Sequence, residues 1–130
     1  MTALRIGAII RRDTPVLSPG TPIRRAAALL SGARAAAAPV VDDDGALVGI
    51  LSQKDCFRPA LHAAYHHEWT GTVADHMTRD VIAIAADEEV IRAAEMFLHH
   101  PHRVFPVLEG GQVAGILSRA EVLALLLQHG

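Results

Sequence analysis

The sequence predicts an α+β fold made of two β-α-β-β-α repeats that pack face to face with pseudo-two-fold symmetry. Three observations support this prediction. The chain contains an internal duplication, each copy alternates between the spacing of a helix and the spacing of strands, and half of a 130-residue chain is small for an independent domain. A unit of about 55 residues buries too little surface to be stable alone, so the two copies are expected to share a core.

The duplication is read directly from two short motifs. The segments 39–41 (Pro-Val-Val) and 49–52 (Gly-Ile-Leu-Ser) recur as 106–108 (Pro-Val-Leu) and 115–118 (Gly-Ile-Leu-Ser). Toward the N terminus the correspondence continues at a constant offset of 67 residues, and it pairs Ile6 with Val73, Ile10 with Met77, Asp13 with Asp80, Ile23 with Val90 and Leu30 with Phe97. We therefore assign one repeat to residues 1–57, a connector to 58–69 and a second repeat to 70–130.

Each repeat is expected to begin with a short extended piece and an amphipathic helix. The extended pieces are residues 15–18 and 81–85. The helices are residues 23–30 and 90–98, where apolar residues recur at spacings of three and four.

A hairpin and a second helix follow in each repeat. The hairpin strands are predicted at 38–41 and 47–51 around Asp42-Asp43-Asp44-Gly45, and at 105–108 and 112–117 around Glu109-Gly110-Gly111. Ser52 and Ser118 then precede an acid by three residues, which is the pattern of a helix capping box. The last helix, 121–128, is apolar on nearly every side, so part of it is expected to meet a second copy of the chain.

Composition excludes several classes of function. The chain is 51% hydrophobic and 20% charged, which suits a packed core, and its formal charge of −2 is too balanced for binding nucleic acid. Its apolar runs are too short to cross a membrane, and the first residues lack a signal-peptide pattern, so we expect a cytoplasmic protein. The single cysteine, Cys56, cannot form an intrachain disulfide and is expected to be a small buried residue.

The paired motifs resemble the tandem CBS domain, named after cystathionine β-synthase, whose pair is called a Bateman module. The resemblance rests on the Pro-Val strand, on Gly-Ile-Leu-Ser leading to an acid, and on the segment 73–81 before the second repeat. It covers almost the whole chain. It implies a sensor that binds adenine nucleotides or other adenosyl compounds in clefts between the repeats.

The resemblance assigns residues to two clefts. The first cleft would use Ser52, Asp55, Asp80, Val81, Ile82, His102, Arg103 and Val104. An aspartate in the first turn of a helix can accept hydrogen bonds from both hydroxyls of a ribose, and Arg103 would supply charge for phosphate. Apolar Val81, Ile82 and Val104 would line the adenine.

The second cleft would use Thr14, Pro15, Ala37, Ser118, Arg119 and Glu121, with Asp13, Ala36 and Ala38 beside them. It departs from the family pattern, because Glu121 replaces the usual Asp and Ala36 stands where Arg103 stands in the other copy. We expect weaker binding there, with Arg119 partly replacing the missing charge. At both serines, a purely structural helix cap is the alternative interpretation.

The sequence therefore predicts a non-enzymatic regulatory module. No cofactor is required, and the possible ligands are AMP, ADP, ATP and S-adenosylmethionine. The expected partners are a second copy of the chain, as a homodimer, and an unidentified regulated protein, with no nucleic acid and no membrane. The alternative is a structural dimerisation module whose clefts are degenerate and empty.

The sequence contains no recognised catalytic motif. The chain lacks a Gly-x-Ser-x-Gly elbow and a phosphate-binding Gly-x-x-x-x-Gly-Lys loop. Among its eight histidines, His62 and His66 have a spacing that can place two imidazoles on one helix face, with His67 and Glu68 adjoining. A third ligand would have to come from elsewhere, such as His76, His99 or His100, and the chain has no His-Glu-x-x-His motif. We therefore predict neither a catalytic residue nor a metal site.

Overall fold

The protein was studied as a computed structural model that describes residues 4–129, with His129 described by its backbone alone. The chain divides into two compact units, which are described separately. The first unit is Thr14–Val81, and the second unit combines residues 4–13 with residues 82–129. The first residues of the first repeat thus belong to the same unit as most of the second repeat. The repeat and connector boundaries assigned from the sequence stay a prediction.

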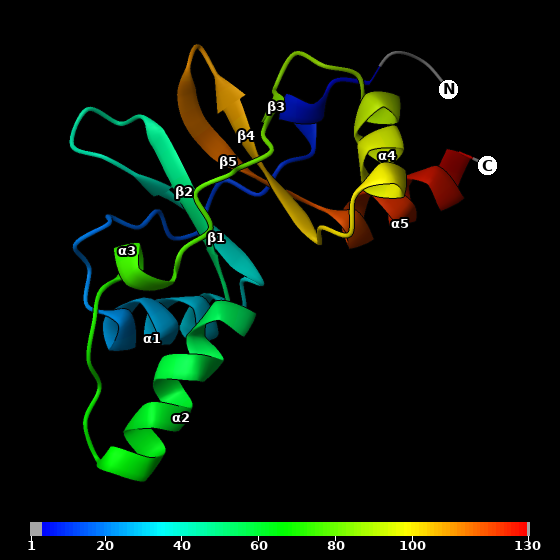
Figure 1. The fold of residues 1–130 in the computed structure, drawn as a ribbon. Helices are drawn as coiled ribbons and strands as arrows, with labels where there is room; N and C mark the ends of the chain where they lie inside the picture. The colour runs from blue at the N-terminus through cyan, green and yellow to red at the C-terminus, as the bar shows by residue number, and fades with distance from the viewer. Residues whose placement is uncertain (1–3, 130) are drawn as a thin grey trace. The chain divides into compact units, whose positions relative to one another are not determined.

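The first unit is a two-stranded hairpin with helices around it (Figure 1). Its elements are α1 (Ile23–Ala33), β1 (Ala37–Val41), β2 (Leu47–Ser52), the 3-10 helix η2 (Lys54–Cys56), α2 (Phe57–His66) and α3 (Val73–His76). β1 and β2 are antiparallel. The extended piece expected at 15–18 contributes a single parallel bridge, in which the Leu17 amide donates to the Pro39 carbonyl at 2.9 Å.

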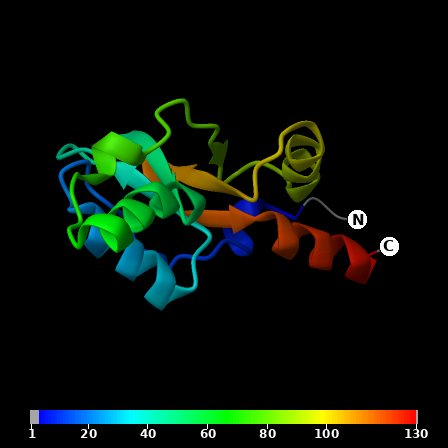
Figure 2. The ribbon, with the colours of Figure 1, turned by 60° about the horizontal axis from the view of Figure 1, so that its bottom comes forward.

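The second unit contains a three-stranded mixed sheet (Figures 1 and 2). Its elements are the 3-10 helix η1 (Ile6–Ala8), β3 (Ile84–Ala85), α4 (Val90–His99), β4 (Val104–Glu109), β5 (Gln112–Ser118) and α5 (Arg119–His129). The sheet order is β3-β4-β5, with β3 parallel to β4 and β4 antiparallel to β5. The extended piece expected at 81–85 is thus a true strand only over its last two residues.

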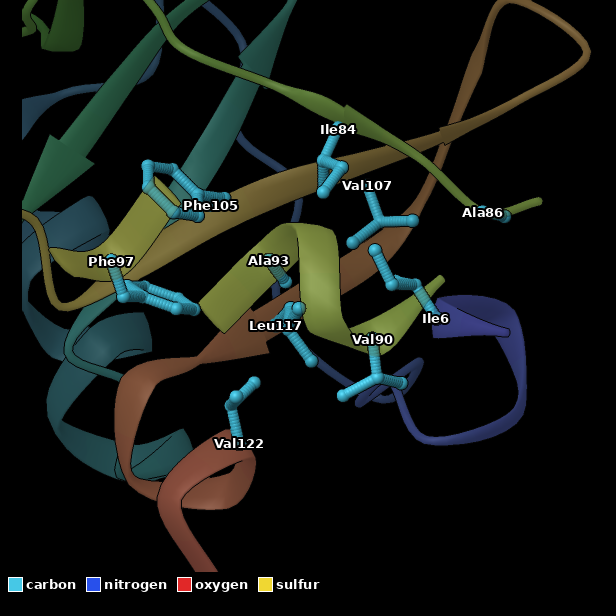
Figure 3. Packing of buried hydrophobic residues seen from close by; sticks show 10 residues of the cluster. All are labelled: Ile6, Ile84, Ala86, Val90, Ala93, Phe97, Phe105, Val107, Leu117 and Val122. Carbon is cyan, nitrogen blue, oxygen red and sulfur yellow. The ribbon is translucent and has the colours of Figure 1, made fainter. Parts of the chain in front are cut away.

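Each unit has its own hydrophobic core. In the second unit, side chains from the sheet, α4, α5 and η1 converge (Figure 3). Phe105 is fully buried and stacks on Phe97 with ring centroids 4.4 Å apart. In the first unit the core comprises Leu17, Ile23, Ala26, Leu30, Ala35, Ala38, Val40, Leu51, Cys56 and Val73. The helix spacings found in the sequence are confirmed, because Ile23, Ala26 and Leu30 form the buried face of α1.

Each unit incorporates the short segment with which the other repeat begins. In the second unit the Ile6 amide donates to the Glu88 carbonyl at 2.9 Å. In the first unit the amide of Val73, which is 67 positions later, donates to the Thr21 carbonyl, also at 2.9 Å. η1 and α3 thus hold equivalent positions in the two units, as the duplication predicts.

A glycine permits the closest approach of these segments. Beside Gly49, the amide of Ile50 and the carbonyl of Thr78 are joined by a hydrogen bond of 2.9 Å. A Cβ atom on Gly49 would lie 2.7 Å from the sulfur of Met77 and 3.0 Å from the Thr78 carbonyl oxygen. These distances are below ordinary van der Waals contact, so the Gly-Ile-Leu-Ser motif needs its glycine because another backbone crosses there.

The second helix of the first repeat differs from its counterpart. It begins with the 3-10 turn η2 and becomes α-helical only at Phe57, whereas α5 begins at once at Arg119. Pro59 explains the difference. In a continuous α-helix from Gln53, the Pro59 ring would clash with the carbonyl of Asp55. Starting the α-helix at Phe57 places Pro59 within its first turn, where a missing amide costs nothing.

Candidate functional site

Ser52 and Asp55 form a closed capping box at the end of β2. The Ser52 amide donates to Oδ2 of Asp55 at 2.9 Å, and the Asp55 amide donates to Oγ of Ser52 at 3.2 Å. Both side chains are half-buried. The cap predicted from the sequence is therefore present, and it fixes the Asp55 carboxylate at the start of η2.

The box leaves polar groups available for a ligand. Among the described residues, no group hydrogen-bonds Oδ1 of Asp55, and the Ser52 hydroxyl accepts a bond while its own proton has no acceptor. One carboxylate oxygen and one hydroxyl donor can therefore bind a vicinal diol such as ribose. The structural and the ligand-binding interpretations are compatible at this position.

Gln53 connects this turn to the residues before β1, a role that the sequence analysis missed. Its amide donates to the Ala36 carbonyl at 2.9 Å, and its side-chain Nε2 donates to the Ala35 carbonyl at 2.8 Å. Ala37 also pairs with Ser52 across the hairpin. The first unit thus brings Ser52, Asp55 and Ala37 together. No local sequence signal marks this role of Gln53.

The second unit repeats this arrangement with a more open turn. The Glu121 amide donates to Oγ of Ser118 at 3.1 Å, and within residues 4–129 the Glu121 carboxylate makes no return bond to Ser118. Glu121 is exposed where Asp55 is half-buried. The Arg119 amide donates to the Arg103 carbonyl at 2.8 Å, and Val104 pairs with Ser118. The longer acid therefore lacks the second bond that holds Asp55.

His102, Arg103 and Val104 lie together at the start of β4. Nδ1 of His102 is buried and has no hydrogen-bond partner in the described part of the chain, and its ring lies 5.5 Å from that of Phe105. The Arg103 side chain is exposed and forms no ion pair with any described carboxylate, so its charge is available. Val104 is buried. A guanidinium without an ion-pair partner among the described residues suits an anionic ligand group.

The remaining predicted residues lie in the segments that border the two units. Asp80 is exposed, whereas Val81, Ile82, Thr14 and Pro15 are half-buried. Val81 is the last residue of the first unit, and Ile82 is the first residue of the segment 82–129 in the second unit. Each predicted cleft draws residues from both units, so the assembly of each cleft stays a prediction.

Asp13 differs from its repeat counterpart Asp80. Nε of Arg11 donates to Oδ1 of Asp13 at 2.9 Å, and this bond and charge lower the pKa of the Asp13 carboxyl. The residue that corresponds to Arg11 in the second repeat is Thr78, which carries no charge. Asp13 is thus bonded to an arginine of its own segment, and weaker ligand binding in the second cleft stays a prediction.

Cys56 faces a separate hollow in the first unit. Cys56 is buried, and this burial, assisted by the charge of Asp55, raises the pKa of its thiol. The cavity has a volume of about 220 Å³ and is lined by Ala27, Leu30, Ser31, Gln53, Cys56, Phe57, Ala60 and Trp69. Its lining is mainly apolar and the thiol stays protonated, so Cys56 is the small buried residue expected from the sequence.

The described residues contain neither a metal-binding cluster nor a membrane-spanning helix. Within residues 4–129, no group of three or more His, Cys, Asp and Glu side chains is arranged to hold a metal ion. None of the helices in that range is both long enough and apolar enough to span a bilayer.

Comparison with known families identifies the fold. The model of the CBS domain matches the chain twice, at residues 6–61 and 73–128. The chain belongs to the CBS domain family. The two matches coincide with the duplicated motifs, and the capping serines Ser52 and Ser118 occupy equivalent positions of two CBS domains.

Solved structures of CBS pairs have the same fold. CBSX2 of Arabidopsis thaliana is 27% identical, with a TM-score of 0.81, and covers 98% of this chain and 97% of its own. The same protein solved in complex with AMP gives a TM-score of 0.79, at 96% and 97% coverage. The CBS pair of MJ0100, solved with methylthioadenosine and S-adenosylmethionine, is 24% identical with a TM-score of 0.82, at 98% and 99% coverage.

Sequence relatives include proteins that are much longer. A 17.7 kDa protein of Acidianus ambivalens is 26% identical over 96% of this chain and 74% of its own length. MJ1225 of Methanocaldococcus jannaschii is 28% identical over 68% of this chain, which spans only 31% of that protein. An A-adding tRNA nucleotidyltransferase of Aquifex aeolicus is 29% identical over 92% of this chain and 14% of the enzyme.

Proposed function

We propose that the chain is a non-catalytic regulatory module that binds an adenosyl compound through Ser52 and Asp55. The observation that carries the proposal is the Asp55 carboxylate, which is fixed by its bond to the Ser52 amide at 2.9 Å and keeps one oxygen free. A fixed acceptor binds a ribose diol without the entropy loss of ordering a mobile side chain. The AMP complex of CBSX2, a 27% identical CBS pair, supports an adenosyl ligand.

Arg103 and His102 extend the proposed site toward phosphate. Arg103 has an unpaired guanidinium and His102 a buried Nδ1 without a partner among the described residues. We place the phosphate of AMP, ADP or ATP beside Arg103. If S-adenosylmethionine is the ligand, its methionyl group would lie beside Arg103 instead.

The proposed output is a change passed to another protein. A ligand shifts an equilibrium between two conformations only by its difference in affinity for them, so binding must favour one arrangement of the module. The regulated protein and the cytoplasmic location expected from the sequence stay predictions.

We also propose that the chain forms a homodimer, and helix α5 supports it. Val122 is buried in the core, but Leu123 and Leu127 are 58% and 75% exposed. Covering these side chains with a second copy would remove apolar surface from water. Sedimentation velocity tests this: the wild-type chain should sediment as a dimer and Leu123→Glu as a monomer, whereas a monomeric wild type would contradict the proposal.

A thermal-shift panel tests the sensor proposal against the structural alternative. The melting temperature is measured with AMP, ADP, ATP, S-adenosylmethionine and, as a control, GMP. A sensor gives a saturable rise in melting temperature with at least one adenosyl compound and a smaller rise with GMP. If none of the four adenosyl compounds raises the melting temperature at millimolar concentration, the module is structural.

A further inference from the structure

The second half of α2 carries two histidines on one exposed face. His62 and His66 are four residues apart in the helix, and their ring centroids lie 4.5 Å apart with an angle of 37° between the ring planes. Both side chains are exposed to solvent. Residues four apart in a helix are neighbours on its surface, so the backbone itself holds the two imidazoles together.

The separation of the rings matches that of two imidazoles on one metal ion. With metal–nitrogen bonds of about 2.0 to 2.1 Å and an angle at the metal of about 90 to 109°, ring centroids lie roughly 4.5 to 5.2 Å apart. The observed 4.5 Å lies at the lower end of this range. Binding would therefore need rotation of exposed side chains but no movement of the helix backbone.

We propose that His62 and His66 form a bidentate site for a divalent transition metal such as Ni²⁺ or Zn²⁺. Imidazole nitrogen suits these ions, whereas Mg²⁺ and Ca²⁺ prefer oxygen. Because the protein supplies two ligands, water completes the coordination sphere and the ion exchanges with solvent. This agrees with the lack of a three-residue cluster in residues 4–129, and it distinguishes the site from a closed structural zinc site.

Residues around His62 and His66 affect the affinity of the proposed site for a metal ion. Arg58 lies four residues before His62 on the exposed side of α2 and weakens cation binding, although salt screens exposed charges. His67 ends the helix in the left-handed conformation, with φ of 59°, and its amide donates to the Ala63 carbonyl at 2.7 Å. A metal on His62 and His66 links the last turn of α2 directly before this cap. The bound ion should therefore stabilise the end of the helix.

Melting temperature and calorimetry on the chain without an affinity tag test the proposal. About 1 mM NiCl₂ should raise the wild-type melting temperature by roughly 2 to 5 °C, and MgCl₂ should not. His62→Ala and His66→Ala should each abolish the rise and weaken Ni²⁺ binding at least about tenfold. His99→Ala, an exposed histidine in the last turn of α4, is the matched control and should keep the rise.

Each other outcome overturns the proposal. A wild type without a Ni²⁺-dependent rise, a His62→Ala or His66→Ala variant that keeps full affinity, or loss of binding only in His99→Ala would each exclude this site. Because His62 and His66 are exposed, both variants should fold, which circular dichroism without metal confirms.

Discussion

The backbones of Arg11 and Ile116 hydrogen-bond to each other in both directions in the second unit. The Arg11 amide donates to the Ile116 carbonyl at 2.9 Å, and the Ile116 amide donates back at 3.0 Å. A Cβ atom on the adjacent Gly115 would overlap the Arg11 carbonyl oxygen. The glycine of the repeated Gly-Ile-Leu-Ser motif thus leaves room for a second backbone segment to cross the strand in both CBS units.

Gly115→Ala should destabilise the protein more than Gly49→Ala. At Gly115 the obstructing atom is backbone, whereas at Gly49 the nearest atom is the Met77 sulfur at 2.7 Å, which can move. We expect losses of about 2 to 3 kcal/mol and about 1 to 2 kcal/mol in the free energy of unfolding. Urea denaturation measures both.

Gly32→Ala is the matched control for these substitutions. Gly32 lies within α1, and a Cβ atom there meets nothing within 4 Å. Alanine is a better helix former than glycine, so this variant should gain roughly 0.5 to 1 kcal/mol. Equal effects of all three substitutions would contradict the crossing argument.

Phe105 and Phe57 offer a second matched pair. Phe105 is fully buried against Phe97, whereas Phe57 is 63% exposed. Phe105→Ala should cost about 3 to 5 kcal/mol of unfolding free energy because it leaves a cavity, and Phe57→Ala should cost less than about 1 kcal/mol. The midpoint of urea unfolding compares them. A small loss from Phe105→Ala would show that the core is not centred there.

Much of this architecture follows from the duplicated motifs. Both hairpins and both first helices lie where the periodicity placed them, and Ser52 and Ser118 cap the following turns. The start of α2 at Phe57 was less accessible, because the capping motif suggested an immediate helix and the effect of Pro59 depends on backbone geometry.

The candidate site was predictable only in part. The acid after each serine is visible as a motif, but the bonds from Gln53 to the carbonyls of Ala35 and Ala36 depend on chain segments 17 and 18 positions away. Residues 4–13 likewise belong to the second unit because of tertiary contacts, such as the bond from the Ile6 amide to the Glu88 carbonyl, which is far away in the sequence. Local sequence carries no signal for such pairings.

The pH dependence of stability should report on Cys56. Folding raises the pKa of this thiol above its ordinary 9.0, through burial and the nearby Asp55 charge. The folded state thus retains the thiol proton, so the associated stability is full below pH 9.0 and is lost as the pH rises toward the folded-state pKa. Urea unfolding from pH 7 to above 9 should show this decline in the wild type and a smaller one in Cys56→Ala.

Arg103→Ala should separate the ligand classes. If its free guanidinium pairs with phosphate, the variant should bind ATP and AMP about tenfold or more weakly and adenosine almost unchanged. Arg119 is the exposed arginine that follows Ser118, and Arg119→Ala should weaken ATP and AMP binding less. Calorimetric titration measures both, and an equal loss for adenosine and ATP would place Arg103 away from the phosphate.

Titration calorimetry of Asp55→Asn against Asp75→Asn tests the central claim most directly. Asp75 closes the same capping box on Thr72, with a bond of 2.8 Å, but lies outside the proposed site. The account predicts that the wild type and Asp75→Asn bind an adenosyl ligand with similar affinity, and that Asp55→Asn binds it at least about tenfold more weakly. Equal affinity in all three proteins, or no adenosyl binding by the wild type, would contradict the account.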